Sequence, residues 1–245
     1  MGNITTIAKR ELSAYFGSPV AYVFIVIFLL LTGFFTFMVG GFFERNEASL
    51  GAFFLWHPWL YLFLVPAVGM RLWSEERRQG TLELLMTMPI TPWQAIVGKF
   101  IASWIFLGIA LALTFPLVFT VNYLGAPDNG VIWGGYVGSF LLAGAYLAIT
   151  CLTSALTRNQ VIAFIISVVV CLILILAGWP PVTNFITALV PDNTWLVGLV
   201  SSFSVMTHFE DFQRGVIDSR HLVFFLSVIG FSLFSTSVVL KSIRS

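Results

Sequence analysis

The chain has 245 residues, of which 58% are hydrophobic and only 9% are charged, and its mean hydropathy is +0.96. A water-soluble domain carries about 25% charged residues, so this composition excludes a soluble enzyme. The net charge of +1 excludes a broad basic surface for nucleic acid, and 25 phenylalanines with 8 tryptophans exclude a disordered chain. The composition therefore predicts a protein that resides in a lipid bilayer.

The N-terminal residues 4–16 have the pattern of a short amphipathic helix. One face of this helix is apolar, and the charged Lys9 and Glu11 are expected to lie opposite it. The apolar face consists of Ile7, Leu12 and either Tyr15 or Phe16. The pattern predicts a helix in the cytoplasmic membrane interface, and Gly17-Ser18-Pro19 then turns the chain into the membrane.

Long stretches without a charged residue predict an all-α integral membrane protein with six transmembrane helices, organised as one transmembrane domain over residues 1–245. A helix needs roughly 20 apolar residues to cross about 30 Å of hydrocarbon. The expected spans cover residues 20–42, 53–72, 96–123, 133–156, 161–179 and 222–240. Pro66 and Pro116 are expected to kink their spans. The shorter segment from Trp195 to Met206 is expected to be re-entrant or interfacial.

The distribution of lysine and arginine predicts the orientation. If the N-terminus is cytoplasmic, Arg45, Arg214 and Arg220 are the basic residues that fall on the outer side, and all the others fall inside. Cytoplasmic loops of membrane proteins carry an excess of basic residues. Both ends of the chain are therefore expected in the cytoplasm.

The cytoplasmic segment 73–95 carries the clearest local signals. Ser74 is expected to cap a helix whose first turn holds Glu75 and Glu76, where the helix dipole favours negative charge. Gly80 is expected to end this helix. The two signals together predict a short helix on the cytoplasmic side.

A second short helix is expected after the first. Thr81 can cap it and Pro89 can end it, and residues 91–94, Thr-Pro-Trp-Gln, form a capping box with proline at the first position of the third span. Its apolar face consists of Leu82, Leu85 and Met86. A solvated loop has no need of such a face, so either lipid or a partner protein is expected to cover it.

Two stretches carry a resemblance to a known family. Residues 75–85, Glu-Glu-Arg-Arg-Gln-Gly-Thr-Leu-Glu-Leu-Leu, followed by Met88-Pro89-Ile90-Thr91, resemble the signature after the second span of ABC-2-type transporter permeases. The layout of the whole chain is similar to that superfamily. Within it, the sequence is most similar to the permease of gliding-motility-associated ABC transporters, and residues 207–218 also resemble that group.

The resemblance implies a mechanism. The segment between spans two and three would be a coupling helix that sits in a groove of a separate ATPase subunit. The positions implied in coupling are Glu75, Glu76, Arg77, Gly80, Thr81, Glu83, Leu84 and Leu85. The resemblance further implies a dimer of identical or different permeases, two ATPase copies that bind ATP and Mg, a bacterial inner membrane, and export of a substrate.

Several functional motifs are absent from the sequence, and their absence narrows the range of expected functions. The sequence has no GxxxxGK[ST] phosphate loop and no catalytic constellation at usable spacing, so the chain is expected to be no enzyme by itself and to hold no cofactor. Ionisable residues are expected to be absent from the span interiors, which disfavours ion-coupled transport. An ion channel would need a polar pore lining, which these spans lack.

Two questions stay open at the outer side. His57, His208 and His221, with Glu210 and Asp211, could in principle hold a metal, although they are far apart in sequence and no metal is expected. The external segment 180–221 is either a gate or platform for a periplasmic accessory protein, or a helix in the outer lipid headgroups. A complex that transmits force to a periplasmic partner without exporting anything is the main alternative to a transporter.

Overall fold

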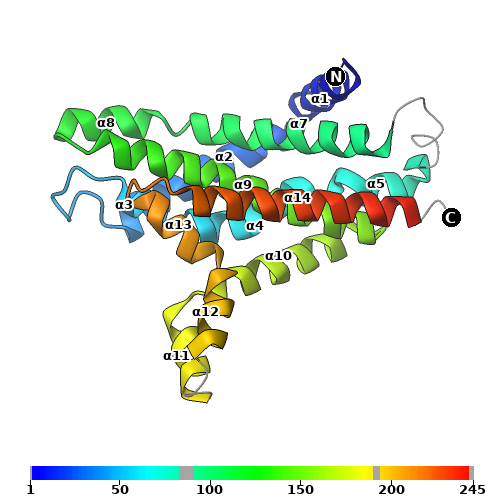
Figure 1. Ribbon diagram of the computed structural model, residues 1–245. Helices are drawn as coiled ribbons and strands as arrows, with labels where there is room; N and C mark the ends of the chain where they lie inside the picture. The colour runs from blue at the N-terminus through cyan, green and yellow to red at the C-terminus, as the bar shows by residue number, and fades with distance from the viewer. Residues whose placement is uncertain (1, 83–90, 190–193, 243–245) are drawn as a thin grey trace.

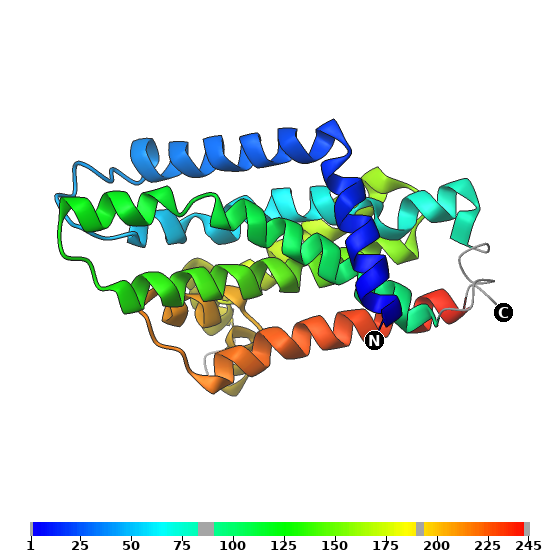
Figure 2. The ribbon, with the colours of Figure 1, turned by 90° about the horizontal axis from the view of Figure 1, so that it is seen from above.

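The computed structural model describes residues 2–82, 91–189 and 194–242, which form helices and loops without a strand. In chain order the helices are α1 (Gly2–Phe16), α2 (Pro19–Phe34), the π-helix η1 (Phe35–Val39), α3 (Gly51–Leu55), α4 (His57–Gly69), α5 (Arg71–Gln79), α7 (Pro92–Ala112), α8 (Pro116–Leu124), α9 (Asn129–Leu156), α10 (Gln160–Leu176), α11 (Pro180–Leu189), α12 (Thr194–Ser202), α13 (Val205–Gln213) and α14 (Ser219–Ser242). Most of the long helices run lengthwise in an elongated bundle, and α1 lies across it near one end (Figures 1 and 2).

Four segments of the described chain are long and apolar enough to cross a membrane. They are Pro19–Val39, Pro92–Leu124, Asn129–Leu156 and Ser219–Ser242, and they coincide with the first, third, fourth and sixth expected spans. The fifth expected span coincides with α10, which is apolar but has only 17 residues. An all-helical membrane protein is therefore confirmed, whereas the count of six spans remains a prediction.

Two of the expected spans are interrupted by turns. The second expected span, residues 53–72, is divided among α3, α4 and α5, with a turn at Trp56 directly before α4. Pro58 lies in the first turn of α4, where its missing N–H costs no hydrogen bond. At Pro116 the structure has a turn over residues 113–115 and then a new helix, α8, in place of a kinked continuous helix.

Helix α9 forms the centre of the bundle. It packs against α4, α5, α7, α10, α13 and α14, and 83% of its most apolar window is buried. Glycines allow this close approach: a Cβ atom at Gly135 would lie 2.5 Å from the ring of Phe54, and one at Gly138 would lie 2.6 Å from Phe212. The glycine-rich start of α9 therefore packs against neighbouring helices.

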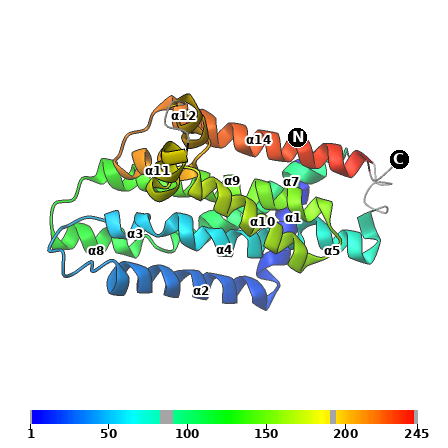
Figure 3. The same ribbon diagram turned by 90° about the horizontal axis from the view of Figure 1, so that it is seen from below.

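Part of the segment 180–221, which was expected to be external, forms a small unit of its own. Helices α11 and α12 pack together and project from the side of the bundle, whereas α13 lies against α9 (Figures 1 and 3). The segment expected to be re-entrant, Trp195 to Met206, is divided between α12 and α13. The hydroxyl of Ser204 caps α13 by accepting from the backbone N–H of Met206.

Candidate functional site

Helix α5 carries the first half of the motif at residues 73–95, and it begins earlier than expected. Met70, directly before α5, has helical backbone angles, and the hydroxyl of Ser74 donates to the carbonyl of Met70. Ser74 is therefore inside the helix and does not cap it, and Glu75 and Glu76 lie in the second turn. The expectation of a Ser74 cap with acids in the first turn was wrong because the chain continues helically from α4.

The inner face of α5 is fixed to α9. The backbone N–H groups of Trp73 and Ser74 both donate to the hydroxyl of Ser154 at 3.0 Å, and the indole N–H of Trp73 donates to the sulfur of Cys151 at 3.2 Å. Trp73 and Ser154 are fully buried. Five polar groups of α5 and α9 thus satisfy one another in a place that excludes water, which makes the joint rigid.

Arg77 forms a further bond between the same two helices. Its guanidinium donates to the carbonyl of Ala155, at the C-terminal end of α9, where the helix dipole favours a cation. Burial, and then repulsion from Arg158, lower the pKa of Arg77. This arginine therefore holds the motif to the bundle and does not project from it.

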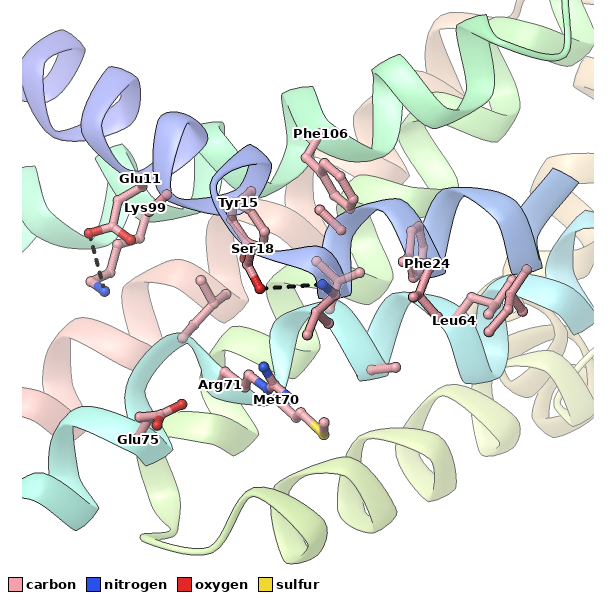
Figure 4. Close-up of a pocket in the computed structure, with 18 residues that line it drawn as sticks. Glu11, Tyr15, Ser18, Phe24, Leu64, Met70, Arg71, Glu75, Lys99 and Phe106 are labelled. Atoms are coloured by element: carbon pink, nitrogen blue, oxygen red, sulfur yellow. Dashed lines mark hydrogen bonds and ion pairs between the residues drawn. The ribbon is translucent and has the colours of Figure 1, made fainter.

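A buried lysine joins three elements at this end of the bundle. The Nζ atom of Lys99, on α7, lies 2.8 Å from a carboxylate oxygen of Glu76 on α5 and 3.6 Å from one of Glu11 on α1. The Lys99 side chain is only 7% exposed, and its Nζ lies 5.4 Å from the centre of the Trp73 ring. Figure 4 shows Glu11 and Lys99 facing each other.

This cluster corrects two expectations. Glu11 faces the bundle, and so does not lie on a solvated face of α1, because Lys99 lies below it. Lys99 was expected in a cytoplasmic segment, but it is buried at the start of the third expected span, residues 96–123. The sequence offered one signal for this cluster, a lysine among apolar residues near the start of a span. A buried cation requires an acidic partner, so such a lysine predicts a buried ion pair.

Helix α1 is also attached to α7 beyond the charged cluster. The hydroxyl groups of Tyr15 and Ser103 are hydrogen-bonded at 2.9 Å, and the Tyr15 ring stacks on Phe106 with centroids 5.1 Å apart. Burial raises the pKa of Tyr15 to about 12, so the phenol stays protonated. The expected N-terminal helix is therefore present and packed on the bundle.

Within the described residues, only a small part of the motif is exposed and free to contact a partner protein. Glu75 accepts from Gln160 at 2.9 Å and from Gln79 at 3.1 Å, so its carboxylate is also occupied within the chain. Exposed positions run from Arg78 through Gly80 to Thr81, whereas Leu82 is buried. Glu83, Leu84 and Leu85, together with most of the expected second helix, lie outside the described residues.

The helix end at Gly80 and the helix start at Thr91 both agree with the local sequence signals. Gly80 ends α5 with φ 70° and ψ 10°, the left-handed conformation expected of a terminating glycine. At the other end the Thr91 hydroxyl accepts from the N–H of Gln94 at 3.3 Å, and the Gln94 side chain accepts from the N–H of Thr91 at 3.1 Å. The expected capping box at the start of α7 is therefore confirmed.

Replacing Gly80 with alanine is expected to destabilise the protein by about 1 kcal/mol. A Cβ atom there would meet nothing within 4 Å, so the cost arises only from the positive φ. The measurement is the melting temperature in detergent, followed by tryptophan fluorescence. Gly198→Ala is the control, since that glycine also has open space but sits in α12, where alanine favours the helix. Equal shifts for the two variants would contradict the prediction.

The three histidines do not converge. His57 is buried beside Phe53 in the bundle, with its Nδ1 atom 2.9 Å from the carbonyl of that residue. His208 and His221 meet at 2.7 Å between their Nδ1 atoms, and His221 lies 2.8 Å from Asp211. In the part of the chain that the structure describes, no group of three or more histidine, cysteine or acidic residues is arranged to hold a metal ion.

The long apolar helices and the polar cluster at one end define a multi-pass helical membrane protein. The family described as ABC-2 family transporter protein matches residues 63–216, more than half of the chain. The chain belongs to this family and is a transmembrane subunit of an ABC transporter. Members of the family are generally non-catalytic and work with an ABC ATPase. No curated protein matches the sequence, and the gliding-motility subgroup remains a prediction.

Proposed function

We propose that this chain is the permease of an ATP-driven exporter and that residues 74–90 couple it to a separate ATPase subunit. The permease would have six spans, including the divided second span and the short α10, with both termini in the cytoplasm of a bacterial cell. Two ATPase copies, each binding ATP and Mg, would act on a dimer of permeases that are identical or different.

The observation that carries this proposal is the attachment of α5 to the bundle. A lever transmits force only when it does not bend at its base. Here Trp73 and Arg77 bind α9, Glu76 binds Lys99 on α7, and Glu75 binds Gln160 at the start of α10. A push on the exposed end of α5 would therefore reach three long helices at once.

This arrangement changes the roles proposed for individual residues. The side chains of Glu75, Glu76 and Arg77 would transmit force within the permease, because each of them is already bonded to another helix. Contact with the ATPase would fall to the exposed edge, which includes Gly80 and Thr81, and to the residues that follow.

Force transmission without export remains the second candidate. The observation that favours it is the α11–α12 pair, which projects from the bundle (Figure 1) with Trp179, Phe185 and Trp195 exposed. A projecting apolar element suits contact with a periplasmic accessory protein as well as contact with outer-leaflet lipid.

A cysteine at Thr81 is expected to cross-link to the ATPase. Thr81→Cys places a reactive thiol on the exposed edge, whereas the natural Cys151 and Cys171 are buried. A short bifunctional cross-linker applied to membranes of the native host is expected to join this chain to a protein that carries a GxxxxGK[ST] loop, identified by mass spectrometry. The purified assembly is expected to hydrolyse MgATP.

Thr120→Cys is the matched control for this experiment. Thr120 is an exposed threonine on α8, far from α5 along the bundle (Figure 1). Capture of the same protein through Thr120→Cys, or ATP hydrolysis by this chain alone, would contradict the proposed function.

A further inference from the structure

A cavity of about 520 Å³ lies among α1, α2, α4, α5 and α7. Its apolar wall includes Val23 and Ile27 of α2 and Leu64 and Ala67 of α4. Val23 is 56% exposed and Ile27 is 42% exposed, so this wall continues onto the outer surface of the bundle. The cavity therefore opens sideways, toward the space that a bilayer would fill. Its volume is in the range of pockets that bind small molecules.

The opposite end of the cavity is charged. Glu11, Arg71, Glu75 and Lys99 line it, and Figure 4 shows these four on one side with Phe24 and Leu64 toward the other. Glu11 pairs with Lys99, and Glu75 accepts hydrogen bonds from two glutamines and lies 3.5 Å from the guanidinium of Arg78. Within the described residues the guanidinium of Arg71 forms no ion pair or hydrogen bond. Among the four charged residues that line this end, Arg71 is thus the one without a bonded partner in the described part of the chain.

The position of Arg71 along the bundle matches a membrane surface. It is the first residue of α5 and directly follows the apolar helix α4. Helix α1, which has the pattern of an interfacial helix, crosses the bundle at the same end (Figure 2). In a bilayer crossed by α2 and α4, lipid phosphates would lie at this level, with their acyl chains extending toward the apolar wall of these helices.

We propose that the cavity binds one anionic phospholipid of the cytoplasmic leaflet. Its phosphate would bind Arg71, whose planar guanidinium donates two parallel hydrogen bonds to a phosphate. One acyl chain would lie against Val23, Ile27 and Leu64. A net negative lipid fits better than a zwitterionic one, because Arg71 is the charged residue lining the cavity that has no partner among the described residues.

The test is lipid binding to the purified protein, measured by native mass spectrometry. Delipidated protein in detergent is titrated with phosphatidylglycerol and, separately, with phosphatidylcholine. We expect one tightly bound phosphatidylglycerol, weaker binding of phosphatidylcholine, and about tenfold weaker phosphatidylglycerol binding after Arg71→Gln, from loss of a charge-assisted pair. Because Arg71 is exposed, this substitution leaves the packing of the bundle intact.

Arg78→Gln is the matched control, since Arg78 is an exposed arginine on the same helix that does not line the cavity. It is expected to bind phosphatidylglycerol as the unmodified protein does. Unchanged binding by Arg71→Gln, equal losses for both arginines, or equal binding of the two lipids would overturn the proposal. The measurement needs no ATPase, so its outcome is independent of the proposed coupling function.

Discussion

Replacing Lys99 with methionine is expected to lower the free energy of unfolding by about 3 kcal/mol. Methionine matches the length of the side chain but removes the ammonium that lies 2.8 Å from Glu76 and 3.6 Å from Glu11. Two partly buried carboxylates would then lie close together without a cation. The change is measured as a fall in melting temperature, and faster proteolysis within α1 is expected because one of its attachments is lost.

Two controls separate charge from packing in this experiment. Lys9→Met removes an exposed lysine of α1 and is expected to have little effect. Combining Lys99→Met with Glu11→Gln and Glu76→Gln removes all three charges, and it is expected to recover part of the lost stability, because no carboxylate then lacks a cation. If the triple variant is no more stable than Lys99→Met alone, the cluster is not stabilised by its charge balance.

Replacing Trp73 with alanine is expected to destabilise the protein by about 3 to 5 kcal/mol. The indole is fully buried against α9 and Lys99, so its removal leaves a cavity and breaks the hydrogen bond to the sulfur of Cys151. Trp93→Ala is the control, since Trp93 is 44% exposed at the start of α7. The measurement is the melting temperature in detergent, and comparable shifts for both tryptophans would refute the packing argument.

Loss of Trp73 also tests the function proposed for α5. If α5 works as a lever, Trp73→Ala is expected to leave the ATPase bound, because the exposed edge at Gly80 and Thr81 is unchanged. ATP hydrolysis is then expected to continue without transport, because the base of the lever is loose. Loss of ATPase binding would indicate that Trp73 acts at the contact itself.

Local sequence signals predicted the features that depend on neighbouring residues. Gly80 ends a helix because a left-handed backbone is accessible to glycine, and Thr91 with Gln94 forms a capping box because both partners lie within four residues. The long, charge-free stretches likewise located the apolar helices. None of these features requires knowledge of how helices pack.

Features that depend on packing could not be read from the sequence. Ser74 has the chemistry of a cap, but the helical continuation from Met70 makes it an interior residue. Glu11, Glu76 and Lys99 lie far apart in sequence, and they meet only because α1 and α5 both approach α7. By contrast, the turn at Trp56 divides the second expected span, and Pro58 in the first turn of α4 was the local signal for it.

The lysine shared by α1 and α5 has a consequence for how the two helices respond to each other. A single ammonium has a limited number of protons to donate, and it now lies nearer to Glu76 than to Glu11. Drawing α5 outward would lengthen the first contact and release the ammonium to the second carboxylate. The attachment of α1 would become stronger as the attachment of α5 becomes weaker, so the two helices compete for one ammonium group.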